Sequence, residues 1–164
     1  MTRFLLLTTL VAAPALAQPA SLAVEGLGTG PQVFDAAALA TLPKAGAAID
    51  AHGKALDCSG VWLADLLAKA GAPAGDQLRG PALAATVTAV ARDGYRVAFS
   101  LGEIDRSLGK APVLIADRCH GAAIGADGPY RLIVGGDSRP ARSVRMLDKL
   151  VVSGAGVPAA AHRH

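Results

Sequence analysis

The chain has 164 residues, of which 52% are hydrophobic, 4% aromatic and 18% charged, and its formal net charge at pH 7 is +3. This length suits one domain with tails, and the composition excludes a two-domain enzyme, a coiled coil and a polytopic membrane protein. Lysines and arginines are dispersed along the sequence and are not interleaved with aromatic residues, so nucleic-acid binding is not indicated either.

Residues 1–17 have the pattern of a cleavable secretory signal peptide. A single positive charge at Arg3 precedes an apolar stretch at 4–11, and residues 15–17 (Ala-Leu-Ala) form a small-x-small cleavage site. The apolar stretch is shorter than the ~20 residues of a membrane-spanning helix. We therefore expect a periplasmic or secreted mature chain that begins at Gln18 and has no membrane span. The signal lacks an Arg-Arg pair, which indicates export of an unfolded chain.

Residues 18–153 predict one α+β domain with a mixed or antiparallel sheet and a few short helices. In chain order, the patterns predict an edge strand at 21–24, a strand at 33–35, a helix at 36–42 capped by Asp35, a strand or hairpin at 47–56 turning at His52-Gly53, and the main helix at 61–70. They continue with a hairpin of strands 84–91 and 95–99, a helix at 101–108 capped by Ser100 with Glu103 in the capping-box position, a buried strand at 113–116, and strands at 130–134 and 143–152. Residues 154–164 are expected to form a disordered tail.

Cationic and hydroxyl side chains gather just before and within the last predicted strand. Arg139, Arg142, Ser143 and Arg145 lie within seven residues. Guanidinium groups and hydroxyl donors that converge on one loop suit an anionic group such as a phosphate. The alternative is a solvated basic face on an edge strand, because Arg142 and Arg145 would lie on opposite faces of a regular strand. The residues alone leave both interpretations open.

Cys58 and Cys119 are the only two cysteines. An even number of cysteines in an exported chain favours a disulfide. Two free thiols and a metal-ligating thiolate are the alternatives. The histidines His52, His162 and His164 fit no ligand spacing, and we predict no metal site, although the terminal His-x-His could capture a transition metal adventitiously.

Five short motifs follow one another in a distinctive order. They are residues 60–67 (GVWLADLL), 93–101 (DGYRVAFSL), 115–117 (IAD) with Gly121, 128–134 (GPYRLIV) and 140–147 (PARSVRML). In this order and spacing, over residues 57–152, the chain resembles the molybdopterin-binding domain of the sulfite oxidase family. The resemblance covers only the later half of that domain, so the chain is identified as a compact relative.

The resemblance implies a sulfite-oxidase-like fold, with molybdopterin as the family cofactor. It places the pterin-binding segment at 141–145, which together with Arg139 gives Arg139, Arg142, Ser143 and Arg145 as cofactor-binding candidates. It also places Tyr95 at the position of an active-site phenol, whereas the alternative is a half-buried hairpin residue. Trp62 is either a pocket-lining residue or a packing anchor. We expect the 139–145 segment to lie near Tyr95 and the start of the main helix at 61–62.

The family's catalytic members carry their molybdenum-ligating cysteine upstream, in a Cys-x-Gly-Asn-Arg motif, and residues 18–57 contain no cysteine. No catalytic residue is therefore assigned. The favoured hypothesis is a non-catalytic module that holds a small anionic or pterin-like ligand or a periplasmic redox protein. The alternatives are a minimal molybdenum-pterin oxidoreductase and a purely structural partner of a redox protein. Because an unfolded exported chain cannot carry a cofactor inserted in the cytoplasm, we expect no loaded molybdopterin and no sulfite oxidase activity.

Overall fold

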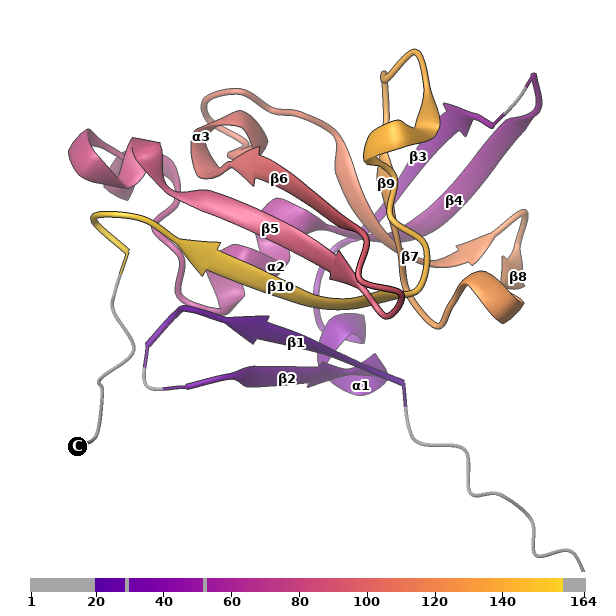
Figure 1. Ribbon diagram of the computed structural model, residues 1–164, viewed down its shortest axis with the longest axis horizontal. Coiled ribbons are helices and arrows are strands. Elements are labelled where there is room, and N and C mark those ends of the chain that lie inside the picture. Colours follow the sequence, from indigo (N-terminus) through magenta and orange to yellow (C-terminus); the bar gives the residue numbers. More distant parts are fainter. Residues whose placement is uncertain (1–19, 29, 52, 158–164) are drawn as a thin grey trace, which may run out of the picture.

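Residues 20–28, 30–51 and 53–157 are described by a computed structural model, and within them the strands form two sheets of five (Figure 1). The first sheet has the order β2 (Gln32–Asp35), β1 (Ser21–Glu25), β10 (Leu147–Ser153), β5 (Thr86–Ala91) and β6 (Arg96–Ser100). The second sheet has the order β3 (Lys44–Asp50), β4 (Ala55–Trp62), β7 (Val113–Cys119) and β8 (Ala122–Ala123), and β9 (Arg131–Val134) also pairs with β7.

Strand pairing makes the first sheet mixed and the second antiparallel. β1 pairs with β10 in parallel, and the other pairings of the described strands are antiparallel. The helices are short: α1 (Ala36–Ala40), α2 (Leu63–Lys69) and α3 (Leu101–Ile104), with 3₁₀ turns η1 (Gly75–Gln77), η2 (Gly80–Ala84), η3 (Gly125–Asp127) and η4 (Pro140–Arg142). The predicted α+β class with few short helices is confirmed.

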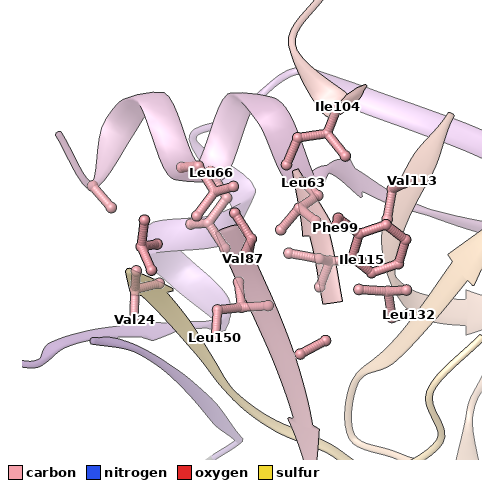
Figure 2. Packing of buried hydrophobic residues seen from close by; sticks show 14 of the residues in the cluster. Val24, Leu63, Leu66, Val87, Phe99, Ile104, Val113, Ile115, Leu132 and Leu150 are labelled. Atoms are coloured by element: carbon pink, nitrogen blue, oxygen red, sulfur yellow. The ribbon is translucent and has the colours of Figure 1, made fainter. Parts of the chain in front are cut away.

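The main core fills the space between α2 and the two sheets. Figure 2 shows Leu66 of α2 beside Val87 and Leu150 of the first sheet, and Phe99 beside Ile115 of the second sheet. All five side chains are at most 2% exposed. Because both sheets and α2 contribute to one apolar cluster, burying it fixes the two sheets relative to each other.

The predicted N-terminal elements and caps are confirmed. The Asp35 carboxylate accepts a 2.7 Å hydrogen bond from the Ala38 amide at the start of α1, as an N-cap should. Ser100 caps α3 in the same way, with 2.9 Å between its Oγ and the Glu103 amide. β3 and β4 form the predicted hairpin, although His52 at its turn lies outside the described residues.

The main helix begins two residues later than predicted. Val61 and Trp62 belong to β4, where they pair with Ile115 and Leu114 of β7, and α2 starts at Leu63. Val61 is buried, as the helical pattern required, but it is buried as a strand residue. The apolar residue Val61 fits both the helical and the strand pattern. The pairing of β4 with β7 therefore determines where the strand ends and α2 begins. The predicted helix 101–108 is also shorter, because α3 ends at Ile104.

The last strand begins later than the predicted residue 143 because the chain changes sheets there. Val144 exchanges two backbone hydrogen bonds with Leu132 of β9, 2.8 and 3.0 Å long. Met146 then adopts a positive φ of 49°, and Leu147 enters the first sheet as the start of β10. At the other end, Val157, which lies in the predicted tail, packs against the core, and residues 158–164 lie outside the described residues.

Candidate functional site

The segment that changes sheets forms one wall of a polar pocket of 340 Å³. Three of the predicted site residues line it, namely Tyr95, Ser143 and Arg145. The full lining is Ala51, Asp93, Tyr95, Asp127, Arg131, Pro140, Ala141, Ser143 and Arg145. We call this cavity the polar pocket. The β5–β6 turn, η3, β9 and η4 thus meet around one cavity.

Tyr95 links the β5–β6 turn to the 139–145 segment. Its hydroxyl donates a 2.6 Å hydrogen bond to the carbonyl oxygen of Ala141 in η4, and its amide donates to the Asp93 carboxylate at 2.9 Å. The side chain is 49% exposed. The expected proximity of Tyr95 to this segment is therefore present. With its proton engaged by Ala141, the phenol oxygen offers the pocket an acceptor and not a donor.

Arg131 and Arg145 supply the positive charge of the polar pocket and share one carboxylate. Arg131 Nη1 lies 3.2 Å from Asp127 Oδ2, and Arg145 Nη1 lies 3.8 Å from Asp127 Oδ1. The Arg131 side chain is only 14% exposed, whereas that of Arg145 is 65% exposed. Burial lowers the pKa of Arg131, an effect that Asp127 opposes and Arg145 reinforces.

The Nε atom of Arg131 has no hydrogen-bond partner, which makes it the one such buried side-chain nitrogen or oxygen in the described part of the chain. A buried N–H without a partner is costly, because folding removes the water that would otherwise bond to it. Arg131 and Asp127 were not among the predicted site residues. The available signal was a lone arginine inside an otherwise apolar strand, where a charge is expected only with a partner.

Ser143 is buried in the wall of the polar pocket. Its Oγ accepts a 3.1 Å hydrogen bond from the Val134 amide of β9. A hydroxyl that accepts one bond still carries its own proton as a donor. Ser143 therefore holds the segment against β9 and retains a donor at the pocket.

Arg142 is turned away from the polar pocket. Its Nε and Nη2 donate to the two Asp137 carboxylate oxygens at 3.0 and 2.7 Å, and its Nη1 donates to Glu103 Oε1 at 2.8 Å. These carboxylates raise its pKa, and the guanidinium also lies 5.4 Å from the centroid of the Phe99 ring. Its donors are thus committed within the fold.

Arg139 is exposed, does not line the polar pocket and forms no ion pair within the described residues. The five predicted binding residues therefore divide into three at the polar pocket and two outside it. Residues 140–142 form the η4 turn, so the side chains of the 139–145 segment do not follow the alternation of a regular strand. Glu103, interpreted from the sequence as a cap, contributes its backbone amide to that cap and its carboxylate to Arg142.

Trp62 lines a different cavity, of 180 Å³, which shares no lining residue with the polar pocket. It also packs partly against a smaller apolar cluster in the second sheet that includes Ile49 and Leu114. Pocket lining and packing, the two alternatives from the sequence, are both present. The expected grouping of residues 61–62 with the 139–145 segment is not found.

The predicted disulfide between Cys58 and Cys119 is confirmed. The two residues are register partners on β4 and β7, with Cα atoms 4.0 Å apart and their sulfurs bonded. Directly opposite residues of adjacent antiparallel strands have Cα atoms about 4.5–5.5 Å apart, so the pairing of β4 with β7 brings the two cysteines within reach of each other. Because the chain has only two cysteines, both free-thiol and thiolate-ligand interpretations are ruled out for the oxidised protein.

The donor set does not fit the molybdenum centre of the catalytic sulfite oxidase family. That centre needs a cysteine thiolate, and both sulfurs are held in the disulfide. Within residues 20–28, 30–51 and 53–157, no group of three or more His, Cys, Asp or Glu side chains is arranged to hold a metal ion. The polar pocket instead offers the guanidinium groups of Arg131 and Arg145 and the Ser143 hydroxyl, which can bind an anion, alongside the carboxylates of Asp93 and Asp127.

Comparisons with known proteins identify the fold. No protein-family model and no curated protein matches the sequence. The structure is similar to the crystal structure of the sulfane dehydrogenase SoxCD from Paracoccus pantotrophus, with a TM-score of 0.59 and 20% sequence identity over 87% of this chain. The fold is of the sulfite oxidase type.

The likeness reaches beyond residues 57–152, on which the sequence resemblance rests, because it covers 87% of the chain. The chain spans 41% of the length of the sulfane dehydrogenase chain. At this level of identity the likeness concerns the fold. Separately, no helix in the described residues has the length and apolar character needed to cross a membrane.

Proposed function

We propose that this chain is an exported, non-catalytic binding module that holds a small anionic or pterin-like ligand in the polar pocket. The observation that carries the proposal is the pair Arg131 and Arg145 around Asp127. Arg145 is 65% exposed and 3.8 Å from its carboxylate partner, which is too far for a strong charge-assisted hydrogen bond. Its guanidinium donors therefore remain able to bind an incoming anion.

The polar pocket is lined by two acidic and two basic side chains, so an anion that binds there replaces an internal contact of one of the arginines. Asp93 and Asp127 formally offset Arg131 and Arg145, but Asp93 is engaged by the amide of Tyr95 in its turn. Asp127 is the carboxylate that pairs with Arg145 in the described residues, so a ligand oxyanion competes with Asp127 for direct contact with that guanidinium. The Ser143 hydroxyl and the phenol oxygen of Tyr95 line the same cavity, so the ligand meets donors and an acceptor, as the polar groups of a pterin ring system require.

The proposed lack of catalysis rests on the disulfide. Oxygen-atom transfer of the sulfite oxidase kind depends on a metal whose electronic properties a thiolate sets. In this chain Cys58 and Cys119 are consumed in their bond. Periplasmic or secreted location is proposed on the signal-peptide pattern of residues 1–17, which lie outside the described residues, and a disulfide agrees with an oxidising compartment.

Titration with inorganic phosphate and with a pterin carboxylate, followed by NMR chemical shifts, tests the binding site. We expect the shifts to centre on the polar pocket and Arg145→Gln to weaken binding about tenfold through loss of a charge-assisted contact. Arg139→Gln is the matched control, since Arg139 belongs to the same loop but not to the pocket, and should leave the affinity unchanged. Equal losses in both variants, or shifts elsewhere on the molecule, would count against the site.

Metal analysis of protein purified from its native compartment tests the absence of catalysis. We expect molybdenum well below one atom per chain and no sulfite-dependent reduction of an artificial acceptor. Stoichiometric molybdenum that disappears in Cys58→Ser or Cys119→Ser would establish the minimal oxidoreductase instead. N-terminal sequencing of the same material should give Gln18 as the first residue, whereas retention of residues 4–11 would contradict the proposed export.

A further inference from the structure

A second cavity, of 180 Å³, lies where β4 ends and the loop after α3 returns to β7. We call it the Trp62 pocket. Its lining combines apolar side chains with two cations: Trp62, Ala64, Ile104, Arg106, Lys110, Ala111, Pro112 and Val113. The polar pocket is lined mainly by charged and hydroxyl groups, so the two cavities differ in the ligands that they can hold.

The floor of the Trp62 pocket is part of the rigid core. Ile104 is 2% exposed and Val113 is 1% exposed, and Figure 2 shows both within the packed cluster. The indole of Trp62 is half-buried at the end of β4. A cavity lined by a planar aromatic side chain and by aliphatic side chains suits a flat apolar group.

The wall of the Trp62 pocket is held in place by backbone hydrogen bonds. The amide of Lys110 donates to the carbonyl oxygen of Asp105 at 2.9 Å, and that of Ala111 donates to the carbonyl oxygen of Glu103 at 3.0 Å. Gly109 packs so closely on Glu103 that a Cβ atom would collide with that residue's backbone. Because the wall is already ordered, a ligand does not have to meet the cost of ordering it.

The rim of the Trp62 pocket carries one uncompensated positive charge. Arg106 pairs with Asp65 at 3.1 Å, whereas Lys110 forms no ion pair within the described residues. Lys110 has a φ of 54°, a left-handed conformation that costs a residue with a Cβ atom about 1 kcal/mol. Unfavourable backbone conformations of this kind often mark functional positions.

We infer that the Trp62 pocket binds a small organic anion with a single-ring apolar body. The ring would lie against Trp62, Ile104 and Val113, and the anionic group would lie beside Lys110. The size is suitable, because an apolar cavity of about 150 Å³ holds one benzene molecule. This site is independent of the proposed polar-pocket function, since the two cavities share no residue.

Fluorescence gives a direct test because Trp62 is the only tryptophan in the chain. Benzoate is the probe, and benzamide is its neutral counterpart of nearly the same shape. We expect benzoate to change the Trp62 emission with a Kd of about 1 mM or tighter, in the range of a ligand of this size. Benzamide should bind about tenfold more weakly, since it lacks the charge that Lys110 would recognise.

Two Lys110 variants separate recognition from folding. Lys110→Gln should weaken benzoate binding about tenfold and leave benzamide binding unchanged. Lys110→Gly also removes the charge, but it suits the left-handed backbone, so it should lose the same affinity without any fall in the unfolding temperature. Lys54→Gln, an exposed lysine at the opposite end of the β3–β4 hairpin, is the matched control and should bind benzoate normally.

Three outcomes would overturn the inference. Equal affinity for benzoate and benzamide would mean that the charge of Lys110 does not contribute to binding. An unchanged Trp62 emission at benzoate concentrations well above about 1 mM would mean that benzoate does not bind in the Trp62 pocket. A loss of benzoate binding in Arg145→Gln together with normal binding in Lys110→Gln would assign the anion to the polar pocket, and that result would leave the proposed function of the polar pocket intact.

Discussion

Arg142 and Glu103 form an ion pair with 2.8 Å between Nη1 and Oε1, although 39 residues separate them in sequence. Because the same guanidinium binds both carboxylate oxygens of Asp137, Arg142 joins the loop after β9 to α3. This connection sets the position of η4, whose Ala141 carbonyl oxygen accepts the hydrogen bond from Tyr95. Arg142 therefore supports the polar pocket indirectly, because it fixes the position of η4, which forms one wall of the pocket.

Replacement of Arg142 should lower stability more than replacement of its neighbour Arg139. Arg142→Ala removes three charge-assisted hydrogen bonds and the contact with Phe99. Because the side chain is 41% exposed, solvent screening reduces the expected loss to about 1 kcal/mol. Arg139→Ala should change the free energy of unfolding by less than about 0.5 kcal/mol. Urea titrations with unchanged m-values would establish both, and equal midpoints would contradict the structural role.

Loss of the Cys58–Cys119 disulfide should cost much of the stability of the domain. The bond closes a separation of 61 residues, and on the chain-entropy model this restriction of the unfolded state contributes about 4 kcal/mol. Denatured, unreduced protein should give no reaction with a thiol reagent. Cys58→Ala/Cys119→Ala should unfold at a markedly lower urea concentration. A positive thiol titration of protein from an oxidising compartment would contradict the bridge.

Asp105 should make stability depend on pH in the acid range. Burial opposes ionisation of its carboxyl, but hydrogen bonds from the Ser107 side chain and from the amides of Gly75, Ser107 and Leu108 outweigh it and lower the pKa. A carboxyl with a native pKa below its unfolded value of 3.8 stabilises the fold above that value. The stabilisation is lost as the pH falls through the lower native pKa.

Asp105→Asn is the variant that isolates this effect. It should be less stable than the parent at pH 7, by about 1–3 kcal/mol because charge-assisted bonds are weakened, and the difference should shrink as the pH falls below 3.8. Unfolding by urea at a series of pH values measures it. Parallel pH profiles for the two proteins would mean that Asp105 does not contribute in this way.

Gly60 should not tolerate a side chain, whereas Gly46 on the neighbouring strand should. A Cβ atom at Gly60 would collide with the backbone of Ile115 and Ala116 in β7, while one at Gly46 would lie 3.5 Å from the carbonyl oxygen of Cys58, an ordinary contact. We expect Gly60→Ala to cost about 3 kcal/mol or more. Gly46→Ala should raise stability by about 0.5 kcal/mol, since alanine has fewer unfolded conformations. Thermal unfolding of Gly60→Ala and Gly46→Ala measures both effects.

Features that depend on a few neighbouring residues were predictable from the sequence. Asp35 and Ser100 both cap a helix through an amide three residues ahead, which is a local interaction. The β5–β6 hairpin around Gly94 is local in the same sense, because its positive φ of 87° suits glycine. Such elements follow from short sequence patterns without knowledge of the rest of the fold.

Features that depend on distant pairing were not predictable in the same way. The strand expected from residue 143 is interrupted because Val144 pairs with β9 before Met146 turns the chain into the first sheet. At the polar pocket, the sequence indicated Tyr95, Ser143 and Arg145 but missed Arg131 and Asp127. The two missed residues come from β9 and η3, and the backbone hydrogen bonds of Val144 with Leu132 and of Met146 with Asp127 bring them beside the 139–145 segment.

The parallel pairing of β1 with β10 also determines the order in which the strands of the first sheet can assemble. Ala23, Val24 and Glu25 near the start of the chain bond to Lys149, Leu150 and Val151, and Glu25 and Lys149 add an ion pair of 3.1 Å. Contacts between such distant segments form slowly, because a long loop must close first. As the chain is synthesised, β1 and β2 must remain a hairpin without a partner strand until β10 has emerged. A chain that stops before Leu147 would expose an edge of β5 and an edge of β1 at the same time. Unpaired strand edges promote aggregation, so the chain is most prone to aggregate before β10 is added.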